Sequence, residues 1–232
     1  MKFIVSKDFF EKVDNAVFGV IIARGINNHE KHEFIDELLK TSIKDCQKYY
    51  EGKVIKESVP ITYYRDAFRK LDINPNKYMC SIEALVTRTV KKGEMPNINS
   101  LVDLGNALSL KYNIPLGIHD IDKFSGNIEI RKANGTEDFI PFGGEGIEHP
   151  DKDEIIYVSG NDVKTRRWTW RQGENSKITN DTTNVFIPLD AFIENKEDML
   201  KLQDEFVEIL KSKLNAEVLV GLVDKNNNEY EF

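Results

Sequence analysis

The order of the secondary-structure signals constrains the fold of this chain most strongly, because their character changes near Pro115. Before that point most apolar residues recur at helical spacing, whereas after it short β-like runs such as "GNIEIRKA", "EIIYVSG" and "NVFIPL" stand between Gly and Asn turns. Helices that come mostly early and strands that come mostly late are typical of an α+β protein. We therefore predict mixed β-sheets packed with helices in a single compact domain over residues 1–232.

The predicted helices have recognisable first and last residues. Apolar spacing predicts one helix over Glu33–Tyr50 and an amphipathic helix over Lys196–Leu214. Three further helices have predicted N-caps, at Ser58, Ser81 and Asn99. Glycine is the usual residue just after a helix, so Gly93 is predicted to end the second of these three.

Two continuous apolar runs predict buried strands. The first is "FGVIIARG" near the start of the chain and the second is "EVLVGLV" near its end. Continuous apolar runs are typical of neighbouring strands that are covered on both faces. We therefore predict that these two strands pair and that sheets from both halves of the chain pack together.

Composition narrows the class of protein. The 232 residues are 40% hydrophobic and 31% charged, as in a soluble globular protein, and no apolar run reaches the roughly 20 residues that span a membrane. The formal charge of -7 argues against a general nucleic-acid binder but leaves room for a local basic surface. Two cysteines without a disulfide pattern and no signal peptide favour a cytoplasmic protein with reduced thiols.

One basic stretch stands out in this acidic chain. "VKTRRWTWRQ", residues 163–172, holds both tryptophans and four positive charges. Read as a strand, it places Trp168 and Trp170 on one face and Arg167 and Arg171 on the other. Two interpretations stay open: a core strand with a solvated basic face, or arginines that project into a cleft and bind phosphate or carboxylate.

The common catalytic signatures are absent from the sequence. Four histidines and two scattered cysteines give no zinc spacing, and there is no nucleophile elbow, phosphate loop or dinucleotide fingerprint. "HDID", residues 119–122, contains metal-binding residue types, but a hydrogen-bonded strand end accounts for it without further ligands. No metal and no organic cofactor is implied.

The segment "SIEALVTRTVKKGEMPNINSLVDLGNALSLKYNIPLGIHDID" carries an ordered set of motifs. A capped helix ends at glycine and is followed by "IN", "LVD", an asparagine, "PL" and an aspartate; "EIRKANGTEDFIPFGGEG" and "SKITNDTTNVFIPLDAF" then continue the order. In order and spacing, residues 80–192 resemble the editing module, the third and fourth domains, of the phenylalanyl-tRNA synthetase β subunit. That module is an α+β unit whose cleft accepts the 3′ end of aminoacylated tRNA and hydrolyses wrongly attached tyrosine.

The resemblance implies particular site residues. The asparagine of the family pocket falls on Asn106, while its threonine, histidine and glutamate positions fall on Gly105, Gly117 and Pro188. His119 comes two residues after the histidine position, so on a strand it would share that face. Because two polar groups that bind the tyrosine hydroxyl are missing, selectivity for tyrosine is not implied. Glycines at 105 and 117 would let a ligand approach the backbone.

Three functional hypotheses follow. The first is a deacylase that acts in trans on mischarged aminoacyl-tRNA, with Asn106, His119 and Asp120 near the ester. Its candidate substrate-binding residues are Gly105, Gly117, Arg131, Arg167 and Arg171. The second is a non-catalytic module that binds a tRNA 3′ end, an amino-acid-like metabolite or a protein partner in the same cleft. The third is hydrolysis of another small ester or amide.

Overall fold

The computed structural model describes residues 1–93 and 95–232. The α-helices are α1 (Lys7–Lys12), α2 (Glu33–Tyr50), α3 (Val59–Lys70), α4 (Ser81–Lys92), α5 (Ser100–Tyr112) and α6 (Lys196–Lys213). The 3-10 helices are η1 (Ile55–Glu57), η2 (Ile121–Lys123) and η3 (Ile193–Asn195). The strands are β1 (Lys2–Val5), β2 (Ala16–Arg24), β3 (His119–Asp120), β4 (Ile128–Lys132), β5 (Ile155–Ser159), β6 (Asp162–Arg166), β7 (Arg171–Gln172), β8 (Val185–Phe192), β9 (Glu217–Asp224) and β10 (Glu229–Glu231).

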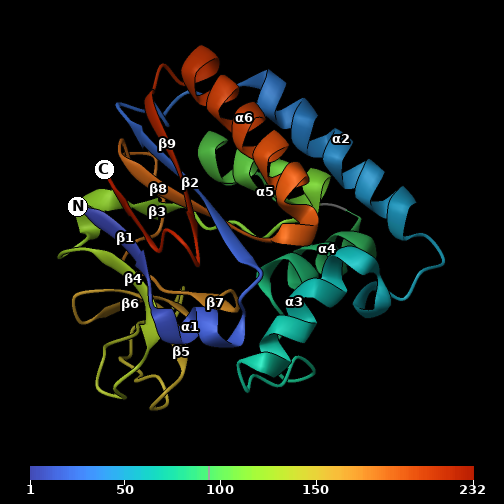
Figure 1. Cartoon of the computed structure of the whole chain (residues 1–232). Coiled ribbons are helices and arrows are strands. Elements are labelled where there is room, and N and C mark those ends of the chain that lie inside the picture. The colour runs from blue at the N-terminus through green and yellow to red at the C-terminus, as the bar shows by residue number, and fades with distance from the viewer. Residues whose placement is uncertain (94) are drawn as a thin grey trace.

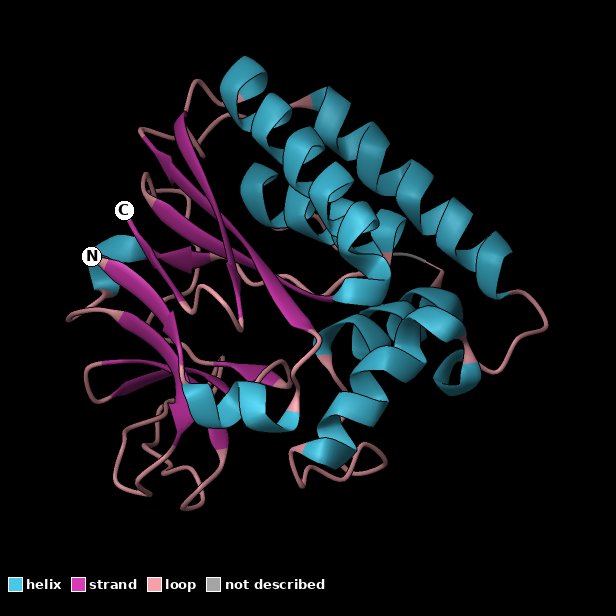
Figure 2. Ribbon diagram, in the orientation of Figure 1, coloured by secondary structure: helices cyan, strands magenta, loops and turns pink. Residues whose placement is uncertain are grey.

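The elements form three layers, helices on a sheet on a second sheet. A four-stranded antiparallel sheet of order β3-β8-β2-β9 carries α5 and α6 on one face, and a six-stranded sheet of order β10-β1-β4-β5-β6-β7 covers the other (Figure 1). The six-stranded sheet is mixed, because β1 and β4 are parallel while its other pairs are antiparallel. Figure 2 shows α2 to α6 gathered on one side of the molecule, and the strands together with the short helix α1 on the other. The α+β prediction is confirmed.

Strand β2 has no polar residue from Ala16 to Ala23, because both of its faces are buried over this length. Phe18 and Ile22 pack with the residues of the six-stranded sheet, whereas Val17 and Ile21 pack with the helices. Successive side chains of a strand point to opposite faces, so a strand between two layers has no polar face. This explains why a middle strand of an antiparallel sheet has the unbroken apolar pattern that is common in parallel sheets.

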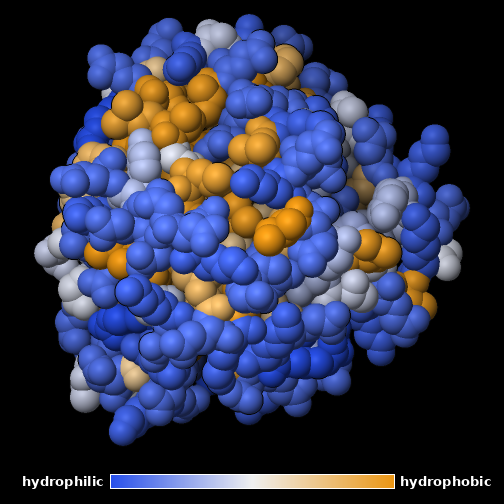
Figure 3. Space-filling view, viewed as in Figure 1, coloured by the Kyte–Doolittle hydropathy of each residue, from blue (hydrophilic) through white to orange (hydrophobic). Residues whose placement is uncertain are grey.

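The predicted pairing of the two apolar runs is confirmed, but their shared burial is not. Strand β9 pairs antiparallel with β2 from Val17 opposite Asp224 to Arg24 opposite Glu217. It is the edge strand of the four-stranded sheet, and Leu219 and Val220 are 51% and 50% exposed. Figure 3 shows an apolar area on the surface in the region of β9. The apolar run of β9 therefore predicted its pairing with β2 correctly, but it did not predict that β9 is partly exposed.

The helix ends follow local sequence signals closely. The Asn99 side chain accepts a hydrogen bond from the backbone N–H of Val102 at 3.0 Å and so caps α5 as predicted. Gly93 follows α4 with a φ of 77°, a left-handed conformation that favours glycine. Ser58 is the N-cap of α3, but the prediction for α4 was wrong by one residue, since Cys80 is its N-cap and Ser81 its first helical residue.

The basic stretch is not one strand, so this prediction was wrong. The chain leaves β6, turns over residues 167–170 and returns as β7. Arg167 and Trp168 have φ values of 45° and 60°, which are costly for residues with a side chain, by roughly 1–3 kcal/mol each. The fully buried Trp168 indole holds the turn, since its N–H donates to Asp190 at 2.7 Å, whereas Trp170 is only half-buried. Side chains do not alternate between two faces over residues 163–172, because the chain reverses its direction at residues 167–170.

Candidate functional site

Two adjoining cavities lie where α4, α5 and the turn between β6 and β7 meet. The larger, here called the outer cleft, has a volume of about 410 Å³ and is lined by Gly105 and Asn106 of α5. The smaller, here called the inner chamber, has a volume of about 50 Å³ and lies between the two sheets. The residues that line both are Leu116, Trp170, Arg171 and Gln172. The two cavities are therefore neighbours with a shared wall.

The outer cleft combines an apolar lining with an amide and positive charge. Asn106 is half-buried on its wall, and the cationic side chains are those of Arg88, Arg171 and Lys177. Arg171 is exposed and forms no ion pair with any residue that the structure describes. No histidine, aspartate or glutamate is among the described residues that line this cleft. It therefore offers hydrogen bonds and positive charge rather than a titratable base.

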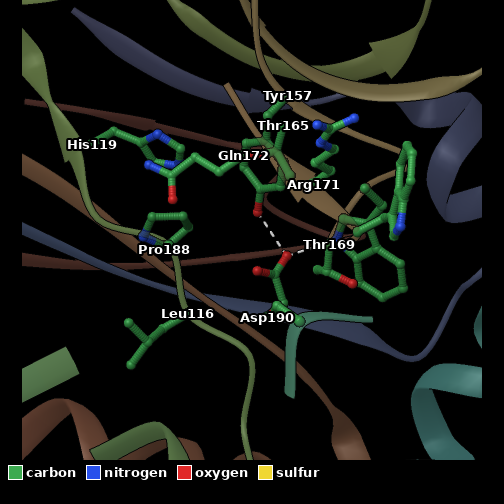
Figure 4. Close-up of a pocket in the computed structure, with 13 residues that line it drawn as sticks. Leu116, His119, Tyr157, Thr165, Thr169, Arg171, Gln172, Pro188 and Asp190 are labelled. Carbon is green, nitrogen blue, oxygen red and sulfur yellow. Dashed lines mark hydrogen bonds between the residues drawn. The ribbon is translucent and has the colours of Figure 1, made fainter. Parts of the chain in front are cut away.

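The inner chamber is built on the pairing of the segment around β3 with β8. Gly117 donates its backbone N–H to the Pro188 carbonyl at 3.3 Å, and Asp190 donates its own to the Pro115 carbonyl at 3.1 Å. His119 lies opposite Phe186 in the same antiparallel register. Alternate residues share a face, so the side chains of His119 and Asp190 line the chamber from opposite ends, with Pro188 between them (Figure 4). Gly117, which is paired with Pro188, lines the chamber at the same level.

His119 is an uncharged group in this chamber. The imidazole is buried, its Nδ1 lies 3.1 Å from the Ser176 hydroxyl, and its ring lies beside those of Tyr157 and Phe186. Burial, with a smaller contribution from the charge of Lys164, lowers the pKa of His119 to about 3. At neutral pH the ring is therefore a hydrogen-bonding group without charge.

The two glycines that were expected to leave room for a ligand have neighbours in that space. A Cβ atom at Gly117 would lie 2.8 Å from Nε2 of His119, which shows that the imidazole covers the position of the missing side chain. A Cβ atom at Gly105 would lie 2.7 Å from Cδ1 of Ile118. Both glycines line a cavity, but protein side chains rather than open space lie against them.

Asp190 lines the inner chamber and is a candidate site residue that sequence reasoning missed. It is 3% exposed, and its Oδ1 accepts hydrogen bonds from the Tyr157 hydroxyl and the Trp168 indole N–H, both at 2.7 Å. Burial raises the pKa of this carboxyl to about 7, although the two hydrogen bonds act in the opposite direction. A lone carboxylate in the apolar run "NVFIPLDAF" was the available signal, since buried acids need partners and often mark functional sites.

Three of the predicted site residues lie away from both cavities. The Asp120 carboxylate caps η2 by accepting from the Asp122 N–H at 3.0 Å, and it also accepts from the Thr182 hydroxyl at 3.0 Å. Arg131 pairs with Glu137 at 2.6 Å. Arg167 pairs with Asp151 at 2.8 Å and with Glu154 at 3.1 Å. Of the three predicted arginines, the structure brings only Arg171 to Asn106 in the outer cleft.

Within residues 1–93 and 95–232 no three His, Cys, Asp or Glu side chains are placed to hold a metal ion together. Among the helices of the same residues, none is long and apolar enough to cross a membrane. Cys46 and Cys80 are buried free thiols.

A family model and similar curated proteins point to the same family. A family model described as the B3/4 domain matches residues 63–218. The phenylalanine–tRNA ligase β subunit of Fusobacterium nucleatum is 28% identical over 165 residues, which cover 70% of this chain and 18% of that protein. The corresponding subunit of Latilactobacillus sakei is 28% identical over 162 residues, which cover 68% of this chain and 19% of that protein. The matched region is thus less than a fifth of either relative.

A solved structure is also similar to this chain. It is an N-terminal fragment of the phenylalanyl-tRNA synthetase β subunit from Pyrococcus horikoshii, with a TM-score of 0.44 and 13% identity. The similarity covers 93% of this chain and 49% of that one. Since the family model spans well over half of the 232 residues, the chain belongs to the B3/4 domain family.

Proposed function

We propose that the outer cleft receives the 3′ aminoacyl end of a tRNA and that the protein hydrolyses the ester of a wrongly attached amino acid, acting in trans. The observation that carries the proposal is the cleft itself, in which Asn106 and Arg171 line a space of about 410 Å³ that adjoins an inner chamber. That volume is in the range of small-molecule sites. The curated relatives are tRNA ligase subunits, which supports tRNA as the partner.

Positive charge at the cleft supports a phosphate-bearing ligand. The chain has a net charge of -7, so long-range attraction to RNA is weak. Arg88 and Arg171 nevertheless line the outer cleft, as does Lys177, which pairs with Glu174. A guanidinium binds phosphate through two parallel hydrogen bonds, which makes Arg171 the candidate for a contact near the terminal nucleotide.

Hydrolysis here would depend on positioning. Ester hydrolysis needs a water molecule and a carbonyl carbon held in line, and such orientation can supply much of the rate. The Asn106 amide offers a donor and an acceptor that can orient the carbonyl or the water. The neutral His119 offers a further hydrogen bond from the inner chamber.

A second candidate function is binding without turnover. The observation that favours it is the lack of a histidine or carboxylate among the described residues that line the outer cleft. A module of this kind would hold a tRNA end, an amino-acid-like metabolite or a protein segment without hydrolysis. The proposal of hydrolysis and this alternative differ in one measurable product, the free amino acid.

The test uses the purified protein and a panel of aminoacyl-tRNAs, with binding and release of free amino acid measured in parallel. We expect at least one member to be hydrolysed by the wild type, with Asn106→Ala slowing release. Arg171→Ala should weaken binding by at least about tenfold, since the loss of even one charge-assisted hydrogen bond costs that much, and reduce the salt dependence by about one ion. Arg69→Ala is the matched control, because Arg69 is exposed on α3 outside both cavities.

Each outcome separates the candidates. Binding with no release by any member of the panel would favour the binding module over the deacylase. Absence of both binding and release would overturn the two together. Equal effects of Arg171→Ala and Arg69→Ala would show that the outer cleft is not the site.

A further inference from the structure

The buried carboxyl of Asp190 uses only one of its oxygens within the protein. Oδ1 accepts both hydrogen bonds, from Tyr157 and Trp168, while Oδ2 accepts none from any residue that the structure describes. Figure 4 shows this second oxygen turned into the chamber, toward Pro188. When Asp190 is ionised, a donor placed in the chamber next to Oδ2 would stabilise the negative charge of this oxygen. No residue that the structure describes supplies that donor.

The rest of the lining is rich in acceptors. The hydroxyl of Thr169 is buried and has no hydrogen-bond partner in the described part of the chain. The Gln172 amide nitrogen donates to the Ile118 carbonyl at 3.0 Å, so its oxygen is the part of the amide left for the chamber. An ammonium group has three donors and no acceptor, which matches such a lining better than a hydroxyl with one donor does.

The volume limits what can enter. A cavity needs a volume of about 10–15 Å³ to hold one water molecule, so a chamber of about 50 Å³ holds only a few non-hydrogen atoms. An ammonium with the carbon that carries it fits this volume, whereas an aromatic side chain does not. Arg171 lines the same chamber but is exposed, and Figure 4 shows its guanidinium apart from the free oxygen.

We infer that the inner chamber binds a primary ammonium group, with the free oxygen of Asp190 as its counter-ion and Thr169 and Gln172 as further acceptors. The ammonium site itself follows from the chamber alone. The inference rests on the proposed function only where it names the molecule that carries the ammonium, an aminoacyl ester. In an aminoacyl ester the α-ammonium is two bonds from the carbonyl, so the ester would lie at the wall shared with the outer cleft. A side-chain ammonium would place the ester farther out.

Trp168 provides a direct readout, because its indole N–H donates to the same carboxyl. The indole resonance is followed by NMR during titration with alaninamide, N-acetyl-alaninamide and 4-aminobutyramide. We expect alaninamide or 4-aminobutyramide to shift the Trp168 signal saturably, and the acetylated compound, which lacks the ammonium, to shift it at least tenfold more weakly. The better of the two amines identifies an α-ammonium or a distal ammonium as the source.

Two variants complete the test. Asp190→Asn keeps an oxygen for Tyr157 and Trp168 but removes the charge, and should weaken binding of the amine at least tenfold. Asp181→Asn, which removes an exposed carboxylate, should leave binding unchanged. Equal binding of alaninamide and N-acetyl-alaninamide by the wild type would overturn the inference without any variant. Unchanged affinity in a folded Asp190→Asn would overturn it as well.

Failure of this inference and failure of the proposed function remain distinguishable. Binding of an amine without binding or hydrolysis of any aminoacyl-tRNA would support the ammonium site and reject the function. Equal hydrolysis of an aminoacyl-tRNA and its N-acetylated form, together with no amine binding, would reject the ammonium site and leave the function standing. A lower kcat in Asp190→Asn at unchanged affinity would instead point to the carboxylate as a proton acceptor and overturn the inference.

Discussion

The buried carboxyl of Asp190 predicts a specific dependence of the free energy of unfolding on pH. Burial raises its pKa from 3.8 to about 7 in the folded protein. Between these values the folded state holds a proton that the unfolded state has lost, so the stability contributed by this group is complete below about pH 4 and falls as pH rises toward 7. At about 1.4 kcal/mol per pH unit, the loss amounts to about 4 kcal/mol.

The perturbation is Asp190→Asn. The amide oxygen can accept the hydrogen bonds of Tyr157 and Trp168 at the same positions, and the amide does not titrate. The free energy of unfolding of the variant minus that of the wild type should therefore increase with pH. We expect a slope of about 1.4 kcal/mol per pH unit between pH 4.5 and 6.5, levelling above pH 7.

His119 has the opposite pH dependence. Its pKa is lowered from 6.5 to about 3, so its contribution to stability is complete above about pH 6.5 and is lost as pH falls toward 3. In the wild type, the contributions of Asp190 and His119 to the free energy of unfolding change in opposite directions with pH. They therefore offset each other between about pH 4 and 6.5. Asp190→Asn removes one of them, so the variant should become clearly less stable in acid than at neutral pH.

The assay is urea unfolding, followed by tryptophan fluorescence at half-unit steps from pH 4.5 to 7.5. Subtracting the two curves cancels His119 and the other groups that both proteins share. Asp181→Asn is the matched control, because it removes an exposed carboxylate, and its curve should follow that of the wild type. A difference between Asp190→Asn and wild type that stays constant with pH would refute the reasoning.

Three shorter predictions concern the core. Trp168→Ala should cost about 3–5 kcal/mol in urea unfolding, as expected for a fully buried large side chain, and Trp170→Ala less than half of that; equal losses would contradict this. Burial raises the pKa values of Cys46 and Cys80 to about 11 and 12, so a thiol reagent at pH 8 should modify them only after unfolding, and rapid labelling of the native protein would argue against it. Arg65→Met should cost about 3–5 kcal/mol, because it leaves a buried carboxylate without its partner at 2.7 Å; a thermal shift matching a loss below 1 kcal/mol would disprove this.

The sequence by itself determined the local elements and the family. The spacing of apolar residues predicted α2 at its observed bounds, Glu33–Tyr50, and cap residues placed the start of α5 and the end of α4. The order of motifs over residues 80–192 indicated the family, whose model matches residues 63–218. These features are readable because caps and helical periodicity depend on residues within a few positions of one another.

Only the tertiary structure decided where the side chains of Arg167 and Arg171 point. A strand pattern over the basic stretch placed Arg167 and Arg171 on one face, but the turn between β6 and β7 separates them. Arg167 is held by Asp151 and Glu154, which lie more than ten residues away in the sequence. Since ion pairs form between side chains that folding brings together, alternation along one strand could not reveal these partners.

The inner chamber likewise exists only in the folded molecule. Its walls come from the segment around β3, from β5 to β8 and from the start of α4, which the stacking of the two sheets brings together. The register of β3 on β8 puts His119 and Asp190 at its two ends, although they are far apart in the sequence. The sequence set the period and ends of the elements, but burial, which shifts both pKa values, is a property of the assembled layers.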